Sequence, residues 1–277
     1  MRQAKYFSKP MVGISKNNPR VRDLRKLLRD PKFRLQCQKF AAEGLEVLKE
    51  CLLTGSWPLD VFVVDNHPTS KEVESLLEAT ETNIWYVEES ILASVATTVT
   101  PQPVISTYST IDVSFEKLMK EYPSFLVCGK EIREPGNAGS LIRSAAAASA
   151  DGIIFTKNSV DLYNPKTIRA SAGAIFRIPI VCSMRSSDCL KAFQDNSISS
   201  LGLSPNGALS YLDFDFSTPF VVFLGNESSG LDDETLTQMN QIARIDMGLG
   251  VESLNVSNAA SVVLFEARRQ RHQIGRD

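Results

Sequence analysis

The segment 134–143 (EPGNAGSLIR) brings together two glycines, an amide side chain and an arginine. Gly136 and Gly139 allow a ligand or a second segment to approach the backbone closely, and the helix that follows offers free N–H groups and the positive end of its dipole. Arg143 lies one to two turns inside that helix and offers a fixed charge for a phosphate or a developing oxyanion. By itself, this spacing also fits a capped helix with a surface arginine.

Two later segments also combine polar side chains with a turn or a helix start. Residues 224–231 (LGNESSGL) leave a predicted strand and turn through two glycines, with Glu227 in the turn. Residues 252–260 (ESLNVSNAA) run into a helix that Ser253 and Asn255 are suited to cap. All three segments follow predicted strands, which is where open α/β sheets place their binding residues. Taken singly, a loop acid and a helix cap are the more ordinary interpretations.

The composition is that of a globular protein, because 43% of the 277 residues are hydrophobic and 22% are charged. This length allows one large or two ordinary domains. The longest apolar runs are far shorter than the roughly 18 residues that a membrane span requires. Residues 1–5 lead into no apolar signal region. We therefore expect a soluble, cytoplasmic protein with no membrane partner.

The chain has few residues that could form a metal site or a Ser-His-Asp triad. The five cysteines include no C-x-x-C pair, which favours a reducing compartment. The two histidines, His67 and His272, lie near no cysteine in the sequence. We therefore expect no metal site and no Ser-His-Asp arrangement.

The net charge of −2 hides a basic beginning of the chain. Residues 1–40 contain twelve Lys and Arg but only two acids, so the rest of the chain is acidic. A basic segment on an acidic body is typical of proteins that grip phosphates locally. The alternatives are a solvated charged face or an organelle targeting segment, because no acid precedes Asp23.

The chain is predicted to form two α/β domains. Asn18-Pro19 opens a basic helix, and strands and helices alternate after it. Between residues 97 and 124, helical periodicity is lost and Thr, Ser and Pro accumulate. We therefore expect a first domain over 1–105, a linker over 106–121 and a second domain over 122–277. The second domain contains the apolar strands of a mainly parallel sheet, at 125–129, 152–155, 178–182, 198–203, 220–224 and 243–246.

In this order, the three segments resemble the three motifs of the SpoU (TrmH-like) ribose 2′-O-methyltransferases of the SPOUT superfamily. The required patterns are N-x-G-x-x-x-R, then G-x-E-x-x-G-L, then S-L-N-V-S-x-A with a later Glu. Asp161 and residues 164–174 also look like the linking segment of that family. Residues 40–44 and the arginines before them look like its L30e-like RNA substrate-binding domain. The resemblance extends from about Val21 to Arg271.

The resemblance implies a deep trefoil knot in the second domain, S-adenosylmethionine as the cofactor, and a homodimer with the active site beside the subunit interface. The residues implied to surround the cofactor are Leu224, Gly225, Asn226, Ile245, Met247, Ser253 and Leu254. In the first domain, the residues implied to grip RNA are Arg20, Arg22, Arg25, Lys26, Arg29, Lys32 and Arg34.

The implied reaction transfers a methyl group to a ribose 2′-hydroxyl, which is a poor nucleophile, so alignment and a nearby cation supply most of the help. Arg143 is implied to stabilise the forming alkoxide, or to use an RNA phosphate to remove its proton. Asn137 and Asn255 are implied to hold the loop and the ribose in line. Glu227 is implied to orient Arg143 or the loop around it.

The first domain resembles that of ribosomal-RNA members of the family, so 23S (large-subunit) rRNA is the expected substrate. Ribose methylation of tRNA is one alternative. Another is a catalytically inactive RNA-binding factor in ribosome assembly, although the intact polar residues of the three segments speak against it. A Rossmann-type methyltransferase is disfavoured because Ser253 replaces the third glycine of G-x-G-x-x-G after 246–250 (DMGLG).

Ser149 departs from the family pattern, which usually has glycine after the helix of the first motif. A left-handed C-cap at this position would lose its least strained residue. We therefore expect this helix to end one position later or in another way.

Overall fold

The computed structural model describes residues 13–275. The alternative of a targeting segment in the first residues of the chain therefore lies outside the described residues. Between residues 13 and 275, no helix has both the length and the apolar character needed to cross a membrane. The chain divides into two compact units, the first comprising residues up to Thr110 together with Tyr163–Pro165, and the second comprising the rest.

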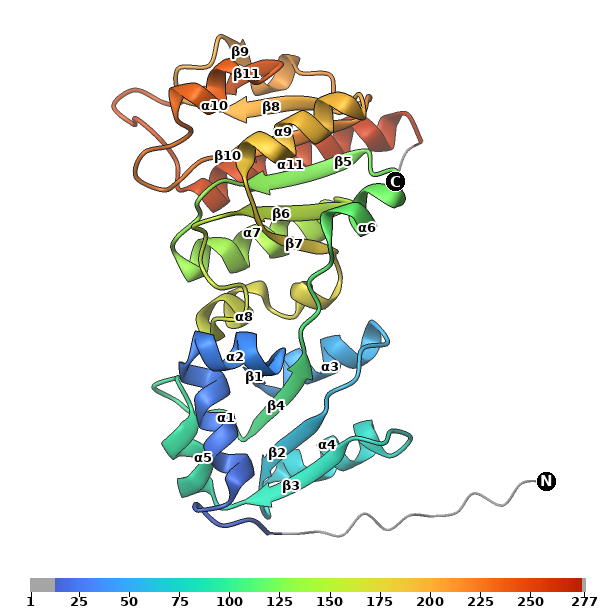
Figure 1. The fold of residues 1–277 in the computed structure, drawn as a ribbon, viewed down its shortest axis with the longest axis vertical. Helices are drawn as coiled ribbons and strands as arrows, with labels where there is room; N and C mark the ends of the chain where they lie inside the picture. Colours follow the sequence, from blue (N-terminus) through green and yellow to red (C-terminus); the bar gives the residue numbers. More distant parts are fainter. Residues whose placement is uncertain (1–12, 276–277) are drawn as a thin grey trace, which may run out of the picture. The chain divides into compact units, whose positions relative to one another are not determined.

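The first unit is a four-stranded sheet with helices (Figure 1). The strand order is β1-β4-β2-β3, with β4 antiparallel to β1 and β2, and with β2 parallel to β3. Its elements are α1 (Pro19–Arg29), α2 (Pro31–Cys37), β1 (Lys39–Glu43), α3 (Leu45–Leu53), β2 (Asp60–Val64), α4 (Pro68–Leu77), β3 (Asn83–Val87), α5 (Glu89–Val95) and β4 (Val104–Ser109).

Helix α1 begins as the sequence predicts. The side chain of Asn18 accepts a 2.9 Å hydrogen bond from the backbone N–H of Arg20, and proline occupies the first turn. The apolar face, including Leu24 and Leu28, is buried, which leaves the basic residues on the opposite face. The sequence analysis missed α2, which begins directly after α1 because Asp30 caps it through the N–H groups of Lys32 and Phe33.

The linker predicted over 106–121 is wrong. Its first residues complete β4, the strand that lies between β1 and β2 in the first sheet. Its last residues form α6 (Phe115–Lys120), which belongs to the second unit. Residues 104–109 are rich in Thr and Ser, which is typical of a loop, but they form a buried strand. Their short side chains fit the pleated surface of a covered sheet.

The second unit is a seven-stranded sheet in the order β7-β6-β5-β10-β8-β11-β9, and all of its pairings are parallel. The prediction of a mainly parallel α/β sheet is confirmed. After α6, its elements are β5 (Phe125–Gly129), α7 (Pro135–Ala147), β6 (Gly152–Thr156), α8 (Pro165–Ser171), η1 (Ala174–Phe176), β7 (Ile180–Met184), α9 (Ser186–Asp195), β8 (Ser199–Leu203), β9 (Leu209–Ser210), η2 (Tyr211–Asp213), β10 (Phe220–Leu224), α10 (Asp233–Thr237), β11 (Gln241–Arg244) and α11 (Val256–Gln273).

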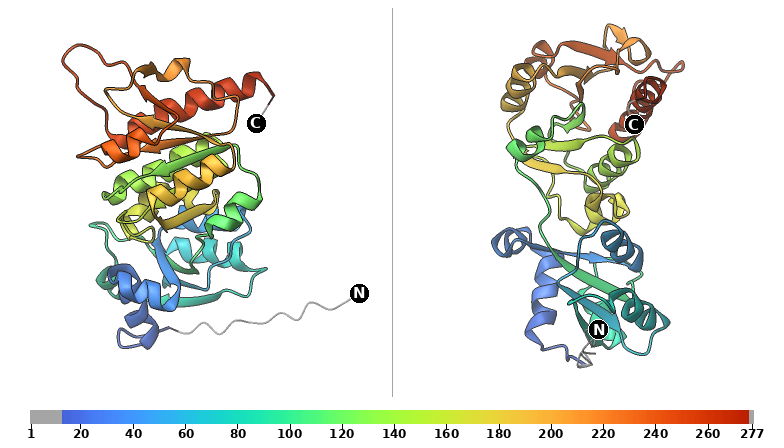
Figure 2. Two further views of the ribbon diagram at one scale, coloured as in Figure 1. Left: turned by 45° about the horizontal axis from the view of Figure 1, so that its top comes forward. Right: turned by 90° about the vertical axis from the view of Figure 1, so that its right-hand side faces the viewer.

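Helices cover both faces of this sheet (Figure 2). Helices α6 and α9 pack on one face, where Leu118 and Phe193 join alternate residues of β5 and β10 in one apolar cluster. Helix α7 packs beside α11 on the opposite face, and Ser144 and Ser261 share a 2.7 Å hydrogen bond between them. The strands are buried on both faces, which explains their continuous apolar sequences.

Helix α7 ends with a left-handed residue at Ser149, whose φ is +61°. The N–H of Ala150 donates to the carbonyl of Ala145, and the N–H of Ser149 donates to that of Ala146. These two hydrogen bonds form a Schellman motif. The expectation that serine shifts or changes the end of this helix is therefore wrong, because the motif is kept with a strained serine in place of glycine.

Candidate active site

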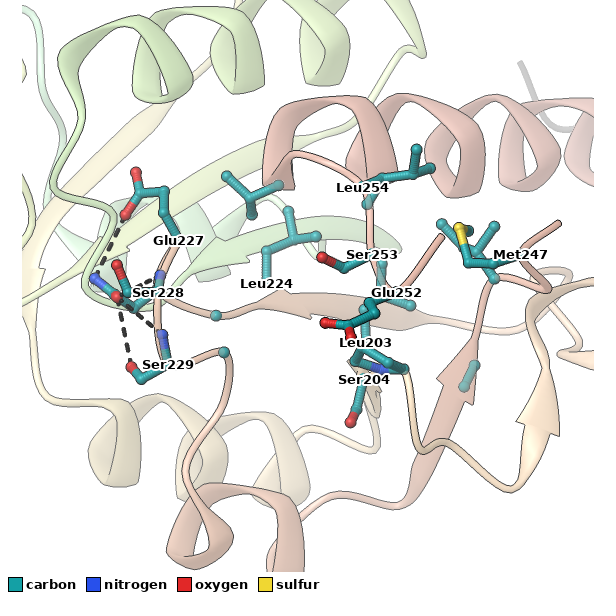
Figure 3. Close-up of a pocket in the computed structure, with 18 residues that line it drawn as sticks. Leu203, Ser204, Leu224, Glu227, Ser228, Ser229, Met247, Glu252, Ser253 and Leu254 are labelled. Atoms are coloured by element: carbon teal, nitrogen blue, oxygen red, sulfur yellow. Dashed lines mark hydrogen bonds between the residues drawn. The ribbon is translucent and has the colours of Figure 1, made fainter. Parts of the chain in front are cut away.

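A cavity of about 310 Å³ lies at the carboxyl ends of β8, β10 and β11 (Figure 3). This is the edge at which parallel sheets bind their ligands. All seven residues that the sequence analysis expected around a cofactor line this cavity. They are Leu224, Gly225, Asn226, Ile245, Met247, Ser253 and Leu254.

The loop that follows β10 closes on itself. The N–H of Asn226 donates to the carbonyl of Gly230 over 3.1 Å, and the N–H of Gly230 donates back over 2.9 Å. The side-chain oxygen of Asn226 also accepts hydrogen bonds from the backbone N–H groups of Ser228 and Ser229. A Cβ atom at Gly225 would lie 2.1 Å from the carbonyl carbon of Gly230. Glycine is therefore required at 225 for the loop to fold tightly.

One hydrogen-bonded chain joins the three motif segments. The Nδ2 group of Asn137, at the start of α7, donates to Oε1 of Glu227 over 3.0 Å. The Nδ2 group of Asn255, the N-cap of α11, donates to Oδ1 of Asn137 over 2.9 Å. Segments that are far apart in the sequence are thereby fixed to one another at the edge of the cavity.

Glu227 holds the loop before α7. Its carboxylate accepts hydrogen bonds from the backbone N–H groups of Arg133 over 3.2 Å and Glu134 over 3.0 Å. Partial burial acts to raise the pKa of Glu227, but the hydrogen bonds from Asn137 and from these N–H groups outweigh it and hold the pKa below its usual value. Of the two roles expected for Glu227, the geometry fits orientation of the loop, since no hydrogen bond links it to Arg143 among the described residues.

Two ion pairs stabilise the loop before α7 and the glycine loop that follows β10. Glu134 caps α7 through the N–H of Asn137 and pairs with Lys166 of α8, which lowers the pKa of Glu134. Lys130, at the end of β5, pairs with Asp232, which caps α10 just beyond the glycine loop. The hydrogen bond from Lys130 lowers the pKa of Asp232 to about 2.

Arg143 stands apart from this network. Arg143 is exposed on α7 and does not line the cavity. It forms no hydrogen bond or ion pair with any residue between 13 and 275. The guanidinium is therefore available to an incoming group. Within one chain, the structure brings Asn137, Glu227 and Asn255 together but does not bring Arg143 to them.

The walls of the cavity are mostly apolar, with a polar rim. Leu203, Leu224 and Met247 contribute apolar surface, whereas backbone groups and short polar side chains surround the opening. The sequence analysis missed Leu203, Ser204 and Pro205 because no motif marks them. Their position at the end of β8, beside β10, was the only available signal.

Most of the residues of the first unit that were expected to grip RNA lie at its surface. Arg22, Lys26, Arg29 and Lys32 are exposed. The guanidinium carbon of Arg20 lies 4.2 Å from the centre of the Trp85 ring, and Arg25 donates a hydrogen bond to Ser94.

Arg34 is a correction to that set. Its residue is only 4% exposed, and its guanidinium donates a 2.7 Å hydrogen bond to the carbonyl of Leu27. Arg34 therefore joins α2 to α1 and does not present its charge at the surface. The helical periodicity of the sequence in this region gave no sign of this burial.

Comparison with known proteins agrees with this geometry. Residues 124–265 match the SpoU rRNA Methylase family, and residues 18–106 match the MRM3-like substrate binding domain. The crystal structure of the SpoU methyltransferase AviRb from Streptomyces viridochromogenes in complex with the cofactor AdoMet superposes with a TM-score of 0.84 at 26% identity, covering 92% of this chain and 98% of that chain.

Two relatives with similar sequences are 23S rRNA 2′-O-methyltransferases. The 23S rRNA (uridine(2479)-2′-O)-methyltransferase of Streptomyces viridochromogenes is 27% identical over 265 residues, which cover 93% of this chain and 92% of that protein. The 23S rRNA (guanosine(2553)-2′-O)-methyltransferase RlmP of Bacillus subtilis (strain 168) is 27% identical over 256 residues, which cover 92% of this chain and 98% of that protein. With its second unit matched along nearly its whole length and the three motif segments joined at one cavity, the chain belongs to the SpoU rRNA methylase family.

Proposed function

We propose that this protein methylates a ribose 2′-hydroxyl of 23S rRNA with S-adenosylmethionine as the methyl donor. The observation that carries this proposal is the chain of hydrogen bonds from Asn255 through Asn137 to Glu227 beside the cavity. Family membership and the names of the two full-length relatives support the substrate. The AdoMet-bound structure of AviRb supports the cofactor.

The cavity suits a nucleoside-containing cofactor. Its apolar walls can cover an adenine ring, and Gly225 allows the backbone of Gly230 to pack against it, which closes the loop that lines the cavity. Leu224, Ile245 and Leu254 would hold the base, and Asn226 and Ser253 would lie beside the polar part. When bound, S-adenosylmethionine supplies a methyl group that is already activated by its sulfonium sulfur.

The residues of this chain supply alignment and charge. Asn137 and Asn255 fix the start of α7 against the start of α11, and Glu227 fixes the loop between β5 and α7. Arg143 supplies a cation whose hydrogen-bonding groups no described residue occupies. It stabilises the alkoxide that forms at the ribose oxygen, or it holds a phosphate that accepts the proton.

The basic face of the first unit holds the RNA backbone. Exposed arginine and lysine side chains give affinity that depends strongly on salt but carries little sequence information. The choice of nucleotide therefore depends on other contacts. Ribose methylation of tRNA and a binding role without catalysis are the competing functions.

We also propose that the protein forms a homodimer. Helix α11 buries Val263, Leu264 and Ala267 against its own unit but exposes Val262 and Phe265 on another side. Leu249 is fully exposed in the loop beside the cavity. Exposed apolar side chains on the elements that border an active site are typical of a subunit interface. The deep trefoil knot and the cytoplasmic location stay predictions.

Retention of radiolabelled S-adenosylmethionine, followed by transfer of label to total RNA, tests this function. We expect the protein to bind the cofactor and to label large-subunit rRNA. Label in tRNA alone would support the tRNA alternative. A protein that retains RNA but transfers no methyl group would be a binding factor, and the proposed function would then be wrong.

A further inference from the structure

One acid in the wall of the cavity, Glu252, has no part in the network described above. The other acid in that wall, Glu227, accepts hydrogen bonds from Asn137 and from two backbone N–H groups. Glu252 is exposed and forms no hydrogen bond or ion pair with any residue between 13 and 275. Its charge is therefore available to whatever enters the cavity (Figure 3).

The cavity is negative as well as apolar. Among the 18 described residues that line it, two are acids and none is Lys, Arg or His. No Lys, Arg or His of the wall neutralises the charge of Glu252. A ligand with a positive charge is therefore favoured over an uncharged ligand of the same shape.

We infer that Glu252 is a specificity residue that makes the cavity prefer the cationic methyl donor to its uncharged product. This inference rests on the proposed function. In the transfer, a bond forms between the methyl carbon and the ribose oxygen, the bond from that carbon to sulfur breaks, and its electron pair stays on sulfur. The sulfonium becomes a neutral thioether, and the hydroxyl proton leaves to a base or to water. S-adenosylmethionine thus has one net positive charge near neutral pH, whereas S-adenosylhomocysteine has none.

The consequence is a cofactor site that distinguishes substrate from product by charge. The two molecules share their adenine, ribose and amino-acid groups, so these parts cannot separate them. A carboxylate close to the sulfur attracts only the charged form. Glu252 would therefore favour binding of fresh cofactor and release of the spent one.

Calorimetric titration of the full-length protein tests this inference. The ligands are S-adenosylmethionine, S-adenosylhomocysteine and sinefungin, in which a carbon bearing a protonated amine replaces the sulfonium. We expect Glu252→Gln to weaken binding of the two cationic ligands by about tenfold and to change binding of S-adenosylhomocysteine by less than about twofold. Glu252→Lys should reverse the preference. Glu121→Gln, which removes an equal charge from an exposed residue outside the cavity, should leave all three affinities unchanged.

Two results would overturn the inference. An equal loss for all three ligands would mean that Glu252 binds the shared ribose or supports the loop, and no loss would mean that it does not face the cofactor. Circular dichroism of each variant checks that it is folded. Failure of the unaltered protein to bind S-adenosylmethionine would be a failure of the proposed function itself, and the inference would fail with it.

Discussion

Asn137 donates a 3.0 Å hydrogen bond to Glu227, a residue 90 positions later in the chain. This bond fixes the start of α7 against the glycine loop that lines the cavity. The backbone N–H groups of Arg133 and Glu134 donate to the same carboxylate, as does the Nδ2 group of Asn226, so four donors converge on one acid. Such convergence keeps two loops at a fixed separation, which is what precise alignment of two substrates requires.

Gly225→Ala should weaken binding of S-adenosylmethionine by at least about tenfold. The added Cβ would lie 2.1 Å from the carbonyl carbon of Gly230, so the loop would have to open. Calorimetry measures the affinity. Gly248→Ala is a matched control, because a Cβ there meets no described atom within 4 Å. Equal affinities of the two variants would show that the tight loop is not needed for the cofactor.

Ser149→Gly should raise the free energy of unfolding by up to about 1 kcal/mol, because glycine adopts the φ of +61° without strain. Urea denaturation measures the change. Ala147→Gly is a control at the exposed last turn of the same helix, and it should lower stability by about 0.5–1 kcal/mol. A destabilising effect of Ser149→Gly would mean that the serine side chain has a stabilising role.

The pair of Asp232 with Lys130 predicts a pH dependence of stability. The pKa of Asp232 is about 2 in the folded protein and about 3.8 without its partners. Its contribution to stability is therefore present above about pH 4 and is lost as the pH falls toward 2. Asp232→Asn keeps a good N-cap for α10 but removes the charge. The difference in unfolding free energy between the two proteins should shrink over that range, and a constant difference would contradict this assignment.

RNA binding should respond to the basic face of the first unit through salt. Arg22→Ala and Lys32→Ala should each weaken binding and reduce the slope of log affinity against log salt by about 0.7–0.9. Both residues are exposed. Lys71→Ala, an exposed lysine of the same unit outside the set, should change neither quantity. Filter binding at several salt concentrations measures the slopes. An unchanged slope for the first two variants would remove them from the RNA contact.

Much of this site could be predicted from the sequence. The resemblance to the SpoU family implied the seven residues around the cofactor, and they line one cavity because the segments that carry them lie at the carboxyl edge of a parallel sheet. The linker was wrong because the Thr- and Ser-rich strand β4 resembles a loop in composition, although it is buried in the sheet. The burial of Arg34 depends on the carbonyl of Leu27 in the preceding helix, and sequence periodicity does not reveal such a partner.

Transfer of labelled methyl from S-adenosylmethionine to purified 23S rRNA, mapped by primer-extension stops at low nucleotide concentration, tests the central claim most directly. The unaltered protein should methylate one ribose. Arg143→Ala should reduce the rate by at least about 100-fold while cofactor binding stays within about twofold, because in the proposed reaction the guanidinium acts on the ribose oxygen rather than in the cavity. Arg185→Ala, an exposed arginine at the start of α9, should retain full activity. Near-normal methylation by Arg143→Ala, or no ribose methylation by the unaltered protein, would contradict the account.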